Sequence, residues 1–113
     1  MLASTARVTT EHPTIYLKRL CRHFADAGQR HSAQEFEVAF DDCEGLIDFA
    51  PVVSATCRLD AREEGVLMVE VRASDQAALD RVQRIVAKHL ERFGQSDGLM
   101  VEWGAAAEQP GTG

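Results

Sequence analysis

The sequence predicts an α+β fold, a two-layer sandwich in which helices cover one face of an antiparallel sheet. Two observations lead to this prediction. The stretch from Asp75 to Phe93 carries apolar residues at the spacing of one helical face. Shorter stretches elsewhere alternate between apolar and polar residues, which is typical of strands with one buried face. The helices should therefore pack on the apolar rows of the sheet, and its other face should meet solvent or a partner.

The chain has the size and composition of one domain. Its 113 residues are 45% hydrophobic and 27% charged, which suits a single core. We expect one α+β domain over residues 1–103. Residues 104–113 are rich in Gly, Ala and Pro and lack aromatic side chains, so they predict a disordered tail.

Charge, hydropathy and cysteine usage limit the classes of partner. There are 12 Lys and Arg residues against 18 Asp and Glu residues, a net charge of −6 without a basic cluster that would attract nucleic acid. No apolar run approaches the roughly 18–20 residues of a membrane span, and the N-terminal residues lack a signal-peptide pattern. We therefore expect a cytoplasmic protein that binds neither nucleic acid nor a membrane. Cys21, Cys43 and Cys57 are widely spaced, which indicates reduced thiols rather than disulfides or a zinc knuckle.

The N-terminal part predicts a strand followed by a helix. Ser4 to Thr9 alternate as in a half-buried strand. Pro13 suits the first turn of a helix, which we expect to end near Ala25. His23 lies at the rim of the apolar face of this helix. Asp26 to Gln34 have no periodicity and predict a surface loop. The apolar face comprises Tyr16, Leu17, Leu20, Cys21 and Phe24.

Four strands should follow as a meander. The Asp41 to Gly45 turn separates the first two of them, and Pro51 ends the second. Glu63 to Gly65 predict a three-residue hairpin loop with Gly65 in the left-handed region. The predicted strands are Glu35–Phe40, Ile47–Phe49, Ala55–Asp60 and Val66–Ala73. The register set by the hairpin loop pairs Leu59 with Val69, Cys57 with Val71, and Arg58 with Glu70.

The long C-terminal helix is the best-specified element. Either Ser74 or Asp75 can cap its first turn, and Gly94 suits its C-terminal end. After it, Leu99 to Trp103 have the length and alternation of a sixth strand. The apolar face of the helix comprises Leu79, Val82, Ile85, Val86, Leu90 and Phe93.

The predicted order of elements is strand, helix, four strands, helix, strand. This order resembles the TATA-binding-protein-like and helix-grip arrangements, in which a curved sheet holds a long C-terminal helix. The likeness concerns topology, and topology does not carry function.

Five segments carry a closer resemblance. They are Ser4–Ala6, Tyr16–Phe24, Cys57–Leu59, His89–Phe93 and Leu99–Trp103. With these segments the chain resembles a small bacterial domain of unknown function over nearly its whole length, the tail excepted. Members of that family also occur fused to flavin-dependent siderophore-interacting proteins, which are ferric-siderophore reductases. The resemblance therefore implies a link to iron by association. The chain departs from the family pattern at Pro51 to Ala55, where members tend to carry a Gly-containing turn.

Two histidines are the first candidates for a ligand-binding site. His89 lies between Val82 and Ile85 in helical projection, so it points into the apolar face of the long helix. His23 lies beside Tyr16 on the first helix. Because both helices should cover the same sheet face, the two imidazoles could converge on a pocket. The alternative is that each is a core histidine bonded to backbone groups.

Other groups could complete this site. Tyr16 and Cys57 are the further candidates for ligand binding, and a metal would need Cys57 or a carboxylate from the sheet beside the histidines. The sequence favours Cys57 as a small hydrophobic residue over Cys57 as a reactive thiolate, because no cationic element faces it. No phosphate loop, nucleophile elbow or zinc-protease motif is present, so no motif names a cofactor or a reaction.

Three functional hypotheses follow. The first is a non-catalytic binding or accessory domain, connected with iron or siderophore handling, that takes a small molecule or metal near His23 and His89. The second is an enzyme that uses one of these histidines as an acid or base. The third is a structural module that forms a homodimer through an edge strand or through an outer-face apolar patch of Leu46, Val66 and Met68.

Overall fold

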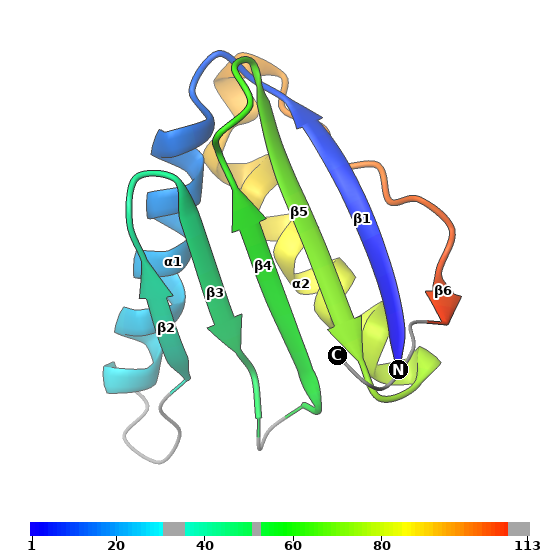
Figure 1. Cartoon of the computed structure of the whole chain (residues 1–113). Coiled ribbons are helices and arrows are strands. Elements are labelled where there is room, and N and C mark those ends of the chain that lie inside the picture. The colour runs from blue at the N-terminus through cyan, green and yellow to red at the C-terminus, as the bar shows by residue number, and fades with distance from the viewer. Residues whose placement is uncertain (31–35, 51–52, 109–113) are drawn as a thin grey trace.

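The computed structural model describes residues 1–30, 36–50 and 53–108 of the chain. Within them, one antiparallel sheet and two long helices form two layers (Figure 1), which confirms the predicted α+β sandwich. The elements are β1 (Leu2–Thr9), α1 (Pro13–Arg30), β2 (Glu37–Phe40), β3 (Glu44–Asp48), β4 (Ala55–Asp60), β5 (Val66–Ala73), α2 (Gln76–Phe93), the 3₁₀ turn η1 (Gln95–Asp97) and β6 (Ala107–Glu108). The strand order across the sheet is β2-β3-β4-β5-β1-β6.

Both helices lie on the same side of the sheet. Figure 1 shows α1 behind β2 and β3, and α2 behind the β4, β5 and β1 part of the sheet. Between the layers, the inward rows of β3, β4 and β5 are buried, as Val69, Leu59 and Val71 illustrate, whereas that of β2 is partly exposed. Four of the six apolar residues predicted for the long helix are buried, namely Leu79, Val82, Val86 and Leu90. The core therefore lies where the two periodicities predict it.

The strand register agrees with the sequence. Gly65 has a φ of 77°, in the left-handed region, and closes the hairpin between β4 and β5. The pairs across this hairpin include Cys57 with Val71, Arg58 with Glu70 and Leu59 with Val69. Gly45 of β3 lies in the next inward position beside Leu59. A Cβ atom on Gly45 would come within 2.7 Å of the Cys21 sulfur, so this glycine lets α1 approach the sheet closely.

The first helix is longer than the sequence predicts. It continues through Asp26 and Gly28 to Arg30 instead of ending near Ala25. A glycine inside a helix costs only about 1 kcal/mol relative to alanine, so it does not by itself end the helix. The remainder of the predicted loop, residues 31–34, lies outside the described residues.

The prediction of a strand at Leu99–Trp103 is wrong. There, only Trp103 forms a β-bridge, to Ala6. The backbone N–H of Leu99 donates to the Gly94 carbonyl at 3.0 Å, and that of Val101 to the Glu91 carboxylate at 3.0 Å. These bonds fold the segment against the end of α2 and leave the Leu99 and Val101 N–H groups unavailable to a β ladder.

A strand forms later in the chain instead. Ala107 and Glu108, in the stretch predicted to be a disordered tail, pair with Ala3 and Leu2 of β1. Residues 109–113 of that predicted tail lie outside the described residues.

Charged side chains dominate the outer face of the sheet. Leu46 is 47% exposed there, but the β4 residues between it and Met68 of β5 are Arg58 and Asp60. Ion pairs cross this face, among them Arg58–Glu44 at 3.3 Å, Arg62–Glu44 at 2.6 Å and Arg7–Glu63 at 2.9 Å. The apolar patch expected from Leu46, Val66 and Met68 is therefore interrupted by charge. Neither α1 nor α2 is long and apolar enough to cross a membrane.

Candidate functional site

The two predicted histidines meet where the two helices pack together. His23 of α1 and His89 of α2 have ring centroids 4.3 Å apart, with their planes tilted by 44°. Both side chains are partly exposed. The convergence that the helical patterns suggested is therefore present in the structure.

Aromatic rings flank the pair. Phe24 meets both imidazoles edge-on, with centroids 5.3 Å from His23 and 5.5 Å from His89. Phe93 lies 5.8 Å from His23 and stacks on His89 at 6.1 Å. The Arg19 guanidinium lies over the Phe93 ring, 5.0 Å from its centroid. The imidazoles thus have apolar walls with positive charge beside them.

Neither the His23 ring nor the His89 ring has a hydrogen-bond partner among the residues that the structure describes. The pKa of His89 is lowered from its ordinary value, first by partial burial and then by the neighbouring His23, Lys88 and Arg92. The His89 ring is therefore mostly neutral at pH 7 and can offer a nitrogen lone pair.

Tyr16 belongs to a different part of the helix interface. It lies two helical turns before His23 on α1, and its buried hydroxyl donates a hydrogen bond to the Asp97 carboxylate in η1. This carboxylate, together with burial, raises the pKa of Tyr16, so the phenol stays protonated. Tyr16 thus fixes the segment after α2 to α1, and the structure does not group it with the histidines.

Cys57 lies in the core. It is fully buried on β4, opposite Ile47 and Val71, and burial raises the pKa of its thiol. This is the environment of a small apolar residue rather than of a reactive thiolate. In the described ranges, no group of three or more His, Cys, Asp and Glu side chains is placed to hold a metal ion. Cys57 therefore does not complete a three-ligand site with the two imidazoles.

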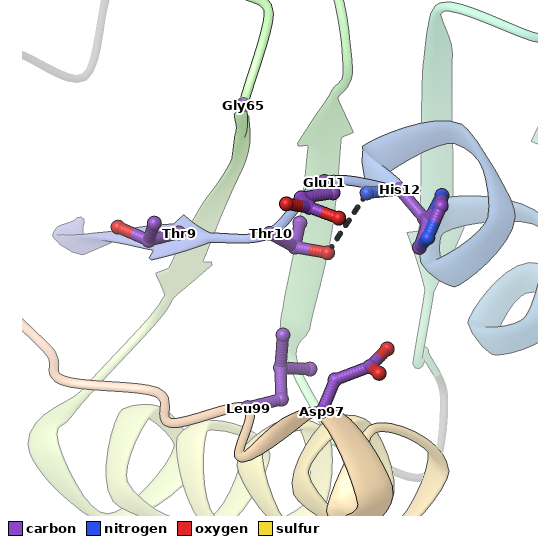
Figure 2. Close-up of a pocket in the computed structure, with 7 residues that line it drawn as sticks. All are labelled: Thr9, Thr10, Glu11, His12, Gly65, Asp97 and Leu99. Carbon is purple, nitrogen blue, oxygen red and sulfur yellow. Dashed lines mark hydrogen bonds between the residues drawn. The ribbon is translucent and has the colours of Figure 1, made fainter.

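A pocket of about 470 Å³ lies where three connecting segments meet (Figure 2). It is formed by the residues between β1 and α1, by the β4–β5 hairpin and by the segment after α2. Its lining residues are Thr9, Thr10, Glu11, His12, Gly65, Asp97 and Leu99. Sequence patterns do not reveal this pocket, because the segments that form it are far apart in the chain. The only local signal was the polar run from Thr9 to His12 just before a helix.

Comparisons with known proteins give a family and a fold. The family described as "uncharacterized protein conserved in bacteria (DUF2218)" matches residues 5–104. The NMR structure of PA4090 from Pseudomonas aeruginosa is 30% identical to the chain, with a TM-score of 0.70. The similarity covers 96% of this chain and 100% of that one. No curated protein matches. Because the family match spans most of the sequence, including both helices, strands β2 to β5 and most of β1, the chain belongs to this bacterial family.

Proposed function

We propose that this protein is a non-catalytic binding domain that holds a divalent transition-metal ion, with Fe²⁺ the leading candidate, between His23 and His89. One observation carries the proposal. Two imidazoles from different helices lie with their centroids 4.3 Å apart, and neither has a hydrogen-bond partner in the described part of the chain.

The donor chemistry fits such an ion. Neutral imidazole suits Fe²⁺, Zn²⁺, Cu²⁺ and Ni²⁺, whereas hard cations prefer oxygen ligands. Two imidazoles bound at right angles to one ion, each nitrogen about 2.0–2.1 Å from it, have centroids roughly 4.5 Å apart. The separation of His23 and His89 is close to this value. Two protein donors leave the other coordination positions to water or a small chelator, which favours exchange of the ion over permanent binding.

The iron assignment draws on the resemblance to domains fused to ferric-siderophore reductases. Reduction of a ferric chelate produces Fe²⁺, which hard oxygen chelators hold less tightly and imidazole holds better. A domain that places two imidazoles side by side is suited to accept the ion after that step. In this proposal the protein is an accessory to iron release rather than the reductase itself.

Acid–base catalysis by the same pair is less well supported. His89 has a lowered pKa, which a general base can use. The side chains in ring contact with it are His23, Phe24 and Phe93, and neither phenylalanine can orient a substrate by hydrogen bonding. Metal binding does not require the neighbouring side chains to orient a substrate, so it fits these surroundings better.

Anaerobic calorimetric titration tests the proposal. Fe²⁺, Zn²⁺, Fe³⁺ and haem are titrated into the wild type, into the His23→Ala/His89→Ala variant and into His12→Ala as a control histidine outside the pair. We expect about one equivalent of Fe²⁺ or Zn²⁺ to bind the wild type and the control, with at least tenfold weaker binding to the double variant. Absence of Fe²⁺ and Zn²⁺ binding to the wild type, or equal binding to the double variant, contradicts the proposal.

A further inference from the structure

We infer that the pocket between the β1–α1 connection, the β4–β5 hairpin and the segment after α2 binds a small aliphatic amine. Its volume of about 470 Å³ is typical of small-molecule sites. The pocket shares no lining residue with the His23–His89 pair, so this inference is independent of the proposed metal site.

Hydrogen bonds hold the three walls of the pocket together. The Thr10 N–H donates to the Gly65 carbonyl at 3.0 Å, which ties the β1–α1 connection to the hairpin. The His12 N–H donates to the Thr10 hydroxyl at 3.0 Å. The Tyr16 hydroxyl, donating to Asp97, joins the third wall to α1. The pocket is thus preformed, which lowers the entropic cost of binding.

The charge of the pocket favours a cation. Glu11 and Asp97 both line it, and neither carboxylate forms an ion pair with a described residue. Tyr16 binds one Asp97 oxygen, Oδ2, and leaves Oδ1 for a ligand. Figure 2 shows the Asp97 carboxylate pointing into the space below Glu11 and His12. An anion would be repelled by the two carboxylates in the pocket and by the net charge of −6 on the chain.

The remaining lining groups suit a short chain with polar ends. Leu99 is 6% exposed and gives the pocket an apolar side for methylene groups. Thr10 is 7% exposed, and its hydroxyl, which accepts from His12, donates no hydrogen bond to the described residues. A protonated amine can therefore pair with the carboxylates while its carbon chain covers Leu99.

The test uses 1,4-diaminobutane as the probe and 1,4-butanediol as its neutral counterpart, in ¹H–¹⁵N NMR titrations of the full chain. We expect the diamine to shift amide signals at residues 9–12, 65 and 97–99, and the diol to bind at least tenfold more weakly. Asp97→Asn keeps an acceptor for Tyr16, and Glu11→Gln changes an exposed side chain. Each should weaken diamine binding at least fivefold.

Two controls separate binding in this pocket from general attraction of a cation to an acidic surface and from binding at the histidine pair. Glu64 is an exposed residue of the same hairpin that does not line the pocket. The Glu64→Gln variant should therefore bind the diamine as tightly as the wild type. The His23→Ala/His89→Ala variant should also bind it unchanged, whatever the result of the metal titrations. Equal affinity for diamine and diol, shifts outside these residues, or unchanged binding to both Asp97→Asn and Glu11→Gln would overturn the inference.

Discussion

His89 is surrounded by positive charge as well as by aromatic rings. His23, Lys88 and Arg92 all lower its pKa, although burial has the larger effect. Across the helix interface, Arg19 of α1 lies over Phe93. Protonation of His89 therefore adds a cation to a partly desolvated and already basic surrounding. The folded state should resist that protonation more than the unfolded chain does.

This resistance predicts a pH dependence of stability. Unfolded histidine titrates near pH 6.5, whereas His89 in the folded chain titrates lower. Between the two values the unfolded chain binds more protons, so its population rises as pH falls. The His89 contribution should be fully present above about pH 6.5 and lost as pH falls through the lowered pKa. Urea unfolding from pH 5 to 8 should give a flatter dependence for His89→Gln than for the wild type. Parallel curves would contradict the assignment.

The sequence predicted the position of a side chain well where that position depends on residues nearby in the chain. Pairing of Cys57 with Val71 followed from the hairpin loop, and the inward direction of His89 followed from helical projection. The bond from Tyr16 to Asp97 could not be predicted in this way. It joins residues distant in the chain, and no periodicity reports which side chains meet after two helices pack.

The start of α2 shows which of two candidate residues caps this helix, a question that the sequence left open. Both Ser74 and Asp75 were capping candidates. In the structure the Asp75 carboxylate accepts a hydrogen bond from the Ala78 N–H at 2.8 Å, and Asp75 has the extended backbone of an N-cap. Ser74 is exposed and contributes its backbone N–H to the Ser54 carbonyl.

This difference gives a matched pair of variants. Asp75→Ala should lower the free energy of unfolding by about 1 kcal/mol, because it leaves an N–H of the first turn without a partner. Ser74→Ala should change it by less than about 0.5 kcal/mol. Urea denaturation of both variants beside the wild type measures the two effects. Equal losses would show that the cap is shared between the two side chains.

The wrong prediction of a strand at Leu99 to Trp103 also has a physical cause in how this segment packs against α2. Alternation in Leu99 to Trp103 is a local signal, and it satisfies the rule for a strand. The Glu91 carboxylate, in the last turn of α2, accepts a hydrogen bond from the Val101 N–H that a ladder would need. Gly94 lets Leu99 pack against the helix end, where a Cβ atom would lie 2.5 Å from the Leu99 Cβ. Such competition from tertiary contacts is not visible in the alternation itself.

Across the whole molecule, the sheet brings the first and last described strands together. β1 lies between β5 and β6 although it begins the chain (Figure 1). Near this edge, the buried Ser4 hydroxyl donates to the Gly104 carbonyl at 2.7 Å, and the Gly104 N–H donates to the Thr5 carbonyl at 2.9 Å. The predicted domain of residues 1–103 excludes Gly104 and β6. It nevertheless contains every buried apolar residue of the described core, which ends at Leu99.

A chain ending at Trp103 should therefore keep its fold but lose stability. The hydrogen bonds of Ser4 and Thr5 to Gly104 are lost, at about 1 kcal/mol each, together with the pairing of β6 to β1. We expect a cooperative urea transition with the free energy of unfolding lower by about 2–3 kcal/mol. Ser4→Ala should cost about 1 kcal/mol in the full chain and clearly less in the shorter one, because the partner of Ser4 is already gone. A non-cooperative transition in the shorter chain would show that the last residues complete the domain rather than only reinforce its edge.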